Sequence, residues 1–198
     1  MAVLRYLSHP QVQIDPDIPV PDWPLSDRGR ARVLALQGAD WLAATGAIIS
    51  SAEVKARETA ALIGDMLGLT PSVDPALNEI DRSSTGFLPH DRHEAVADAF
   101  FANPDSSIEG WERASDVQAR GVSAIRAYVA RHPGGDLLIV GHGGIGTLSW
   151  CGLAGQDARH RPDQAAGGGS VWAASLPNLS PIHGWQVMER LATNAPRC

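Results

Sequence analysis

Residues 137–144 decide the fold, and they read Leu-Leu-Ile-Val-Gly-His-Gly-Gly. Four consecutive apolar residues are typical of a strand that is covered on both faces, as the strands of a parallel sheet are. The glycines then break the strand and open a helix, whose first amides and dipole favour a bound anion. In parallel α/β sheets, ligands bind beyond the carboxyl ends of the strands. The stretch therefore predicts that His142 and the amide of Gly143 lie at a ligand site.

A second stretch near the N-terminus has the same design. Residues 4–9 read Leu-Arg-Tyr-Leu-Ser-His, and Pro10 then stops the strand because proline has no amide donor. One histidine at a strand end is more often structural than catalytic. Two such histidines, each ending its own strand, favour a functional pair. We expect His9 and His142 to face each other across a phosphate-sized pocket, both accessible to solvent and roughly 4–8 Å apart.

The rest of the chain alternates between strand-like and helix-like segments. This alternation predicts an α/β fold, a three-layer α/β/α sandwich with a mostly parallel central sheet. A chain of 198 residues with 44% hydrophobic residues suits one domain, spanning 1–198. A loop with five prolines covers residues 10–24, and a polar, glycine-rich connection covers 154–169. Strands are predicted at 3–8, 47–51, 137–140, 170–175 and 185–191, and helices at 26–45, 53–67, 91–102, 114–131 and 143–153.

Composition excludes several classes of partner. The formal net charge is −6 and no block of Lys or Arg occurs, so neither nucleic acid nor an anionic membrane is an expected partner. The two cysteines, Cys151 and Cys198, form no cluster with histidine, so neither a metal site nor a disulfide scaffold is indicated. No apolar run approaches eighteen residues, and we expect a cytoplasmic protein.

Six short motifs together resemble those of one known family. They come in the family's order, and the chain resembles the histidine phosphatase (phosphoglycerate mutase-like) superfamily over nearly its whole length. The matching segments are Leu-Ser-His-Pro at 7–10, Leu-Ser-Asp-Arg-Gly at 25–29, Ser-Ser-Ala-Glu-Val-Lys-Ala-Arg-Glu-Thr-Ala at 50–60, Leu-Asn-Glu at 77–79, Gly-Trp-Glu at 110–112 and Val-Gly-His-Gly-Gly at 140–144.

The resemblance implies a catalytic role for three residues. His9 would be the nucleophile that carries the phosphoryl group as phosphohistidine. Glu79 would protonate the leaving alkoxide and then activate water, although an exposed loop carboxylate is the plainer interpretation of this residue. His142, as an imidazolium or a hydrogen-bond donor, would stabilise charge on the phosphoryl oxygens. The family chemistry requires no cofactor and no metal ion.

The chain departs from the family pattern at its phosphate-binding positions. The residue before the nucleophile is Ser8 where the family has arginine, and Pro10 replaces a glycine. Lys55, the only lysine of the chain, stands where the family has a second arginine. An ammonium is a point charge, whereas a guanidinium binds phosphate through two parallel hydrogen bonds, so neither change is conservative.

Other groups could complete the phosphate site. Arg82 and Arg113 are the candidate replacement cations, with Arg113 preferred because its segment lies near the pocket in the family; an arginine at either position more often forms an ordinary surface salt bridge. The predicted phosphate-binding set is therefore Ser8, Lys55, Arg113, Arg82 and Gly143.

Two functions remain open at this stage. The first is a metal-independent phosphatase that acts on a small phosphorylated substrate or a phosphoprotein through phosphohistidine, with a weakened phosphate pocket. The alternative is a catalytically degenerate member that binds an anionic ligand or a protein partner. A metal-dependent hydrolase is disfavoured because no further residue has ligand-like spacing beside either histidine.

Overall fold

A six-stranded sheet forms the centre of the protein, and its strand order is β3-β2-β4-β1-β5-β6. The computed structural model describes residues 2–191, so Cys198 lies outside the described residues. The first four strands of that order run parallel, and β5 and β6 are antiparallel to their neighbours. The strands are β1 (Val3–Ser8), β2 (Thr45–Ser50), β3 (Ser72–Val73), β4 (Asp136–Gly141), β5 (Ser170–Ser175) and β6 (Pro181–Val187).

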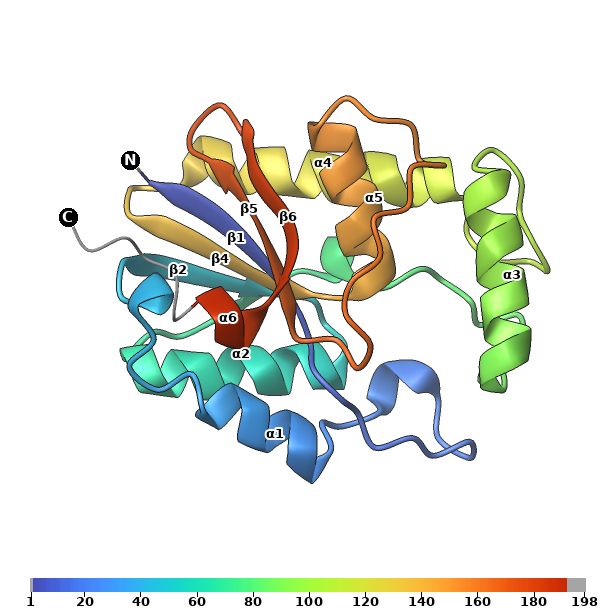
Figure 1. Ribbon diagram of the computed structural model, residues 1–198, viewed down its shortest axis with the longest axis horizontal. Helices are drawn as coiled ribbons and strands as arrows, with labels where there is room; N and C mark the ends of the chain where they lie inside the picture. The colour runs from blue at the N-terminus through green and yellow to red at the C-terminus, as the bar shows by residue number, and fades with distance from the viewer. Residues whose placement is uncertain (1, 192–198) are drawn as a thin grey trace.

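Helices cover both faces of this sheet, as Figure 1 shows. The α-helices are α1 (Asp27–Leu34), α2 (Val54–Leu67), α3 (His90–Ala102), α4 (Ala114–Arg131), α5 (Gly143–Leu153) and α6 (Met188–Leu191). Three short 3-10 turns lie between them: η1 (Val20–Asp22), η2 (Asp40–Leu42) and η3 (Pro75–Leu77).

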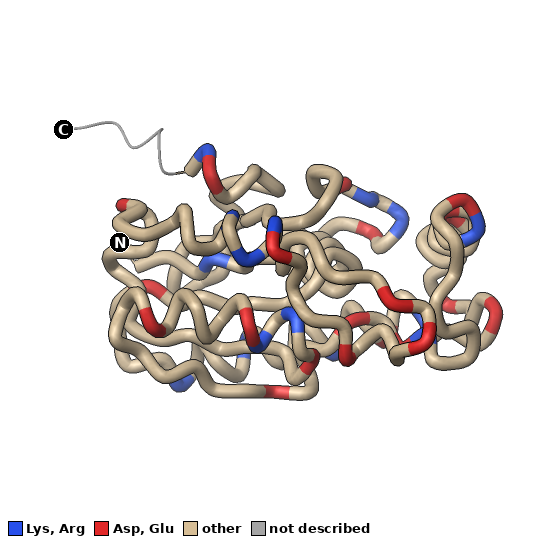
Figure 2. Tube along the Cα trace, turned by 90° about the horizontal axis from the view of Figure 1, so that it is seen from below, with Lys and Arg blue, Asp and Glu red and all other residues tan. Residues whose placement is uncertain are grey.

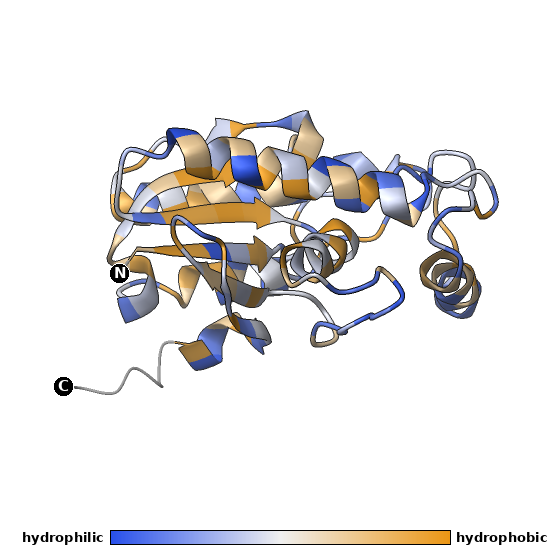
Figure 3. Ribbon diagram, turned by 90° about the horizontal axis from the view of Figure 1, so that it is seen from above, coloured by the Kyte–Doolittle hydropathy of each residue, from blue (hydrophilic) through white to orange (hydrophobic). Residues whose placement is uncertain are grey.

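The alternation of side chains along the strands explains the three layers. Leu7, Leu138 and Val140 pack with residues of α1 and α2 in one apolar cluster. Their neighbours along the same strands, including Tyr6 and Ile139, pack with α4 residues in a second cluster on the opposite face. Apolar colour therefore runs along most of the length of β4 (Figure 3). The predicted three-layer α/β fold with a mostly parallel sheet is confirmed.

Two predicted elements are wrong in extent. The helix predicted over 26–45 ends at Leu34, and the chain then turns through Gly38, which has a φ of +78° that a helix does not allow. Trp41 is still buried, but it lies in the turn η2. The strand predicted over 185–191 ends at Val187, because α6 follows it directly.

The pairing of β1 with β4 brings the two histidine-bearing turns together. Ser8 is in register with Gly141, and the amide of His9 donates to the carbonyl of Gly141 over 2.9 Å. Both turns therefore leave the sheet at the same edge. Helix α3 stands beyond that edge, apart from the sheet (Figure 1), and packs with Trp111 and α5 in a third apolar cluster.

Along the Cα trace of residues 2–191, the positions of Lys and Arg are interspersed with those of Asp and Glu (Figure 2). None of the helices within residues 2–191 is long and apolar enough to cross a membrane. In the same part of the chain, no three His, Cys, Asp or Glu side chains come together as a set that could hold a metal ion.

Candidate active site

His9 and His142 face each other at the carboxyl edge of the sheet. Their ring centroids lie 5.2 Å apart with the planes at 70°, which agrees with the spacing expected from the sequence. His9 is partly exposed, but His142 has no exposed surface. The expectation that both rings are solvent-accessible is therefore wrong for His142, because Ser51 and Glu53 lie against its outer nitrogen.

A backbone hydrogen bond fixes the tautomer of His9. Nδ1 lies 2.8 Å from the carbonyl oxygen of Pro10, and a carbonyl can only accept, so Nδ1 carries the proton. Nε2 then holds the free lone pair. Burial, assisted by the nearby His142 and Lys55, lowers the pKa of His9 to about 3, so the ring is neutral at physiological pH. Such a ring has the form that a nitrogen nucleophile needs.

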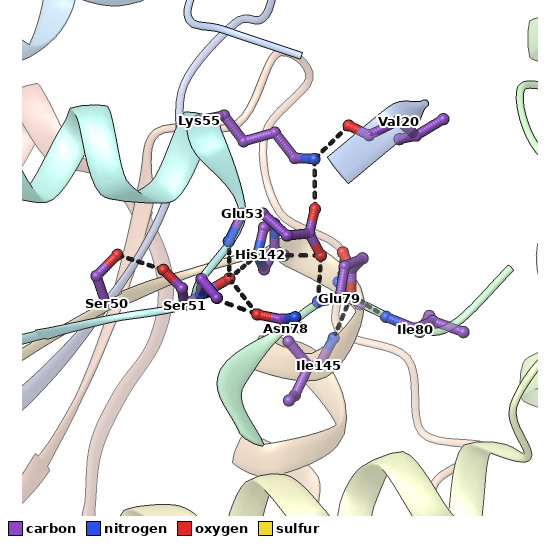
Figure 4. A network of polar contacts seen from close by, with 12 residues as sticks. Val20, Ser50, Ser51, Glu53, Lys55, Asn78, Glu79, Ile80, His142 and Ile145 are labelled. Carbon is purple, nitrogen blue, oxygen red and sulfur yellow. Dashed lines mark hydrogen bonds and ion pairs between the residues drawn. The ribbon is translucent and has the colours of Figure 1, made fainter. Parts of the chain in front are cut away.

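The hydrogen bonds around Ser51 fix the tautomer of His142. The Ser51 hydroxyl donates to Oδ1 of Asn78 over 3.0 Å, and its oxygen accepts the amide of Glu53 over 3.1 Å. Oδ1 of Asn78 also accepts the amide of Ala52, which settles the orientation of that side chain. The hydroxyl has only one hydrogen, so the 2.7 Å contact with His142 is a hydrogen bond donated by Nε2. Figure 4 shows this network.

The other ring nitrogen of His142 has no partner. Within the described residues, Nδ1 is fully buried and forms no hydrogen bond. Burial lowers the pKa of His142, although Glu53 and Glu79 oppose the shift. The ring is thus neutral in the free protein, with a lone pair on Nδ1.

Glu79 lies over the first turn of α5. Its Oε2 accepts the amide of Gly144 over 3.0 Å, and its Oε1 accepts the amide of Ile145 over 2.9 Å. A carboxylate at this point is favoured by the helix dipole and by amides that lack a partner within the helix. Arg120 of α4 holds the segment from behind, because its guanidinium donates to the carbonyl of Asn78 over 2.9 Å. Glu79 is therefore a fixed group of the cleft and not a loose loop carboxylate.

Lys55, which the sequence predicts to be a phosphate-binding cation, belongs to a buried ion pair. The Lys55 ammonium pairs with Oε2 of Glu53 and donates to the carbonyl of Val20 in η1 over 2.7 Å (Figure 4). The two side chains are only 4% and 6% exposed. Oε1 of Glu53 accepts the amide of Glu79 over 2.8 Å and lies 3.6 Å from Nε2 of His142. Burial alone would raise the pKa of Glu53, but His142 and the Lys55 ammonium bring it to about 2.

Two cavities meet at His9, Glu79 and Arg82. One, of about 640 Å³, lies between these residues and the proline-rich loop; it includes Glu53, Lys55, His142, Asn78, Pro21 and Trp23. The other, of about 490 Å³, opens towards α3 and includes His90, His93, Trp111, Gly143, Arg161 and Gln164. His9 and Glu79 thus stand on the boundary between two lobes of one cleft.

The predicted cations have different positions. Arg82 lines both lobes; its guanidinium lies 5.9 Å from the Trp111 ring, and among the described residues it has no carboxylate partner. Arg113 lines neither lobe, because its guanidinium pairs with Asp116 at the surface over 2.6 Å. The structure therefore brings Arg82 and Lys55 to the cleft but does not bring Arg113 there.

Gly143 lines the lobe towards α3, whereas Ser8 lies beneath the cleft. The Ser8 hydroxyl is hydrogen-bonded to Gln164 and accepts the amide of Ser170 over 3.1 Å, and the residue is 1% exposed. It points into the protein and does not reach the cleft. Gly143 lies so close to Gln164 that a β-carbon would be 2.1 Å from its amide nitrogen. Gln164 therefore fills the space beside both residues.

Comparisons with known proteins show the family to which the chain belongs. Residues 16–172 match the family model described as histidine phosphatase superfamily (branch 1). The chain belongs to this superfamily. The matched range begins after His9, so the first histidine is assigned by its geometry and not by that match. No curated protein sequence matches the chain significantly.

Several solved structures share its fold. A mycobacterial glucosyl-3-phosphoglycerate phosphatase with inorganic phosphate superposes with a TM-score of 0.77 at 24% identity, covering 98% of this chain and 100% of the other. Bacillus stearothermophilus YhfR gives 0.74 at 23%, covering 94% and 95%. An Entamoeba histolytica phosphoserine phosphatase with 3-phosphoglyceric acid gives 0.75 at 14%, covering 96% and 100%.

Sequence reasoning missed three residues of this candidate site. Glu53 and Ser51 stand within the 50–60 segment, which was examined only for its cation. An acidic residue two positions before the sole lysine was the available signal for the ion pair. Gln164 lies in a polar connection without a motif, and no local pattern in the sequence indicates it.

Proposed function

We propose that this protein is a metal-independent phosphatase that hydrolyses a phosphomonoester through phosphohistidine at His9, with a weak hold on the phosphate. The observation that carries the proposal is the hydrogen bond that Nδ1–H of His9 donates to the Pro10 carbonyl. It leaves the Nε2 lone pair free on a neutral ring that faces a second histidine. We take residues 1–198 as one catalytic domain.

The first half of the reaction transfers the phosphoryl group to the protein. Nε2 of His9 forms a bond to phosphorus while the ester P–O bond breaks, and the electron pair leaves on the alkoxide oxygen. Glu79, in its protonated form, supplies the proton that makes this oxygen an alcohol. In the second half, Glu79 takes a proton from a water molecule while the water oxygen attacks phosphorus. The N–P bond then breaks, and His9 recovers its lone pair.

The charges in the cleft make the reaction slow. Family members hold the phosphoryl oxygens with arginines, but here Lys55 is neutralised by Glu53. The loss of one preorganised donor typically lowers turnover about 10²–10³-fold. Arg82 is the remaining cation of the cleft without a carboxylate among the described residues, and we assign it to the anion.

The substrate we propose is a small phosphorylated molecule or a phosphorylated protein side chain. Support comes from the structural neighbours, which include phosphatases named for glucosyl-3-phosphoglycerate and phosphoserine. The lobe towards α3 would receive the leaving group, because it adjoins Glu79 on the side away from the Glu53–Lys55 pair.

Hydrolysis of an aryl phosphate in the presence of EDTA tests this proposal. We expect slow turnover near about pH 5–7, abolished in His9→Ala and retained in His132→Ala, which changes a partly exposed histidine at the end of α4. Activity that survives His9→Ala, or that requires a divalent cation, contradicts the mechanism.

One observation favours a second candidate, a degenerate family member that binds an anion or a protein without catalysis. Glu53 places a buried negative charge where a phosphate dianion would need positive charge. The two candidates differ in one covalent property. A degenerate protein forms no phosphohistidine with any phosphodonor, whereas the phosphatase does.

A further inference from the structure

The buried ring of His142 lacks the proton that an anion would need. Nε2 donates its hydrogen to the Ser51 hydroxyl, and that hydroxyl donates its own hydrogen to Asn78. Nδ1 therefore carries a lone pair and no hydrogen. In the described part of the chain it is buried without a hydrogen-bond partner. No rotation of the Ser51 hydroxyl reverses this polarity, because Asn78 Oδ1 must accept from both Ser51 and Ala52.

An anion between the two rings would meet this lone pair with another acceptor. Phosphoryl and sulfate oxygens have no hydrogen to donate, and two acceptors in contact repel each other. The contact becomes favourable once Nδ1 is protonated, because an imidazolium donates a charge-assisted hydrogen bond to an anionic oxygen. A bound anion must therefore bring a proton into the site.

Glu53 is placed to hold the imidazolium that results. Oε1 lies 3.6 Å from Nε2, on the side of the ring opposite to the unpartnered nitrogen. Its position is fixed by the Glu79 amide and by the Lys55 ammonium. A buried carboxylate at this distance favours the charged form of a histidine.

We propose that anion binding in this cleft is coupled to protonation of His142 at Nδ1, with Glu53 as the buried counter-ion. Glu53 is then a positioning residue that acts through His142. The proposal uses the proposed function only to place the anion between the rings. It also explains why a carboxylate is retained in a pocket for phosphate.

The charged groups around the two rings favour protonation of His142 over protonation of His9. Glu53 and Glu79 favour the charged form of His142, whereas Lys55 and Arg82 oppose it. Around His9, the second histidine and Lys55 disfavour a charge while Glu53 favours it, and Nδ1 of His9 is already protonated towards Pro10. The imidazolium at position 142 is thus the one with a carboxylate beside it.

Sulfate is the probe for this coupling, because it carries no proton at neutral pH. Calorimetric titration at pH 7.5, in two buffers with different protonation enthalpies, counts the protons taken up. We expect roughly one proton per sulfate, and an affinity that falls about tenfold per pH unit on the alkaline side.

Glu53→Gln tests the counter-ion. We expect proton uptake at pH 7.5 to fall below about half a proton per sulfate, because the imidazolium has lost its carboxylate. The matched control is Glu58→Gln on the same helix, whose carboxylate pairs with Arg30 and accepts the Leu25 amide. This variant should take up as many protons as the wild type.

Nitrogen NMR of histidine-labelled wild type gives a readout that needs no variant to fold. Sulfate should convert Nδ1 of His142 from a bare to a protonated nitrogen while Nε2 stays protonated. Sulfate binding without proton uptake, uptake unchanged in Glu53→Gln, or no sulfate binding down to pH 5.5 overturns the proposal. Phosphohistidine trapping decides the proposed function separately, so a proton-linked site that forms no phosphohistidine would contradict only that function.

Discussion

Replacing Lys55 with methionine would leave the Glu53 carboxylate buried without its cation. The two side chains are almost fully enclosed. Among the described residues, the other group beside Glu53 that can carry a positive charge is His142, which is neutral at physiological pH. Methionine keeps the length and the apolar stem of lysine, so the change removes charge with little loss of volume.

The size of the effect follows from the burial of the Glu53 charge, because its side chain is only 6% exposed. Breaking a buried ion pair by removing one partner typically costs about 3–5 kcal/mol. We therefore expect Lys55→Met to lower the free energy of unfolding by about 3 kcal/mol or more at pH 7.

The pH dependence has a definite sign. Because the folded-state pKa of Glu53 is depressed, its contribution to stability is complete above about pH 4.5 and is lost as the pH falls towards 2. In Lys55→Met the carboxyl group is protonated at milder acidity, which relieves the unpaired charge. The difference in stability between wild type and variant should therefore shrink as the pH is lowered.

Urea unfolding at several pH values measures this difference. The matched control is Arg30→Met, because Arg30 pairs with Glu58 over 3.4 Å while 44% exposed, and its loss should cost less than about 1 kcal/mol. The double change Glu53→Leu with Lys55→Met should recover most of the stability, since no unpaired charge remains. A loss below 1 kcal/mol in Lys55→Met, or one independent of pH, would refute the buried pair.

Three further predictions concern the cleft. Ser8→Arg, which restores the family residue, should destabilise the fold by about 2–4 kcal/mol in urea unfolding, because the site is 1% exposed and cannot hold a guanidinium. Gly144→Ala should lower turnover of an aryl phosphate about 10²-fold or more, because its β-carbon would lie 2.8 Å from Oε1 of Glu79 and displace the carboxylate. Arg82→Gln should raise KM about tenfold while Arg113→Gln leaves it unchanged, because only the first of these arginines lines the cleft.

The sequence predicted the parts of the site that depend on strand ends. Each histidine follows an apolar strand, and parallel pairing of those strands places both histidines at one edge of the sheet. This placement does not depend on the conformation of the loops. Glu79 was predicted only through the resemblance to the family. Its contact with the first turn of α5 could not be predicted from the local pattern, because 65 residues separate Glu79 from Gly144.

The ion pair and the surface arginine show where local patterns are insufficient. Glu53 is the extended N-cap of α2, and Lys55 lies in the first turn, so the spacing rules for side chains within a helix do not bring them together. Arg113, in contrast, precedes Asp116 by three residues at the start of α4, a spacing that favours their surface pair over a position in the cleft.

Trapping the covalent intermediate tests the central claim most directly. The protein is mixed with a radiolabelled aryl or acyl phosphate, quenched in alkali and digested, and the labelled peptide is identified by mass spectrometry. The account predicts acid-labile, alkali-stable phosphate on His9, absent in His9→Ala and present in His132→Ala. Label on any other residue, or product formation with no labelled histidine on the turnover timescale, would contradict it.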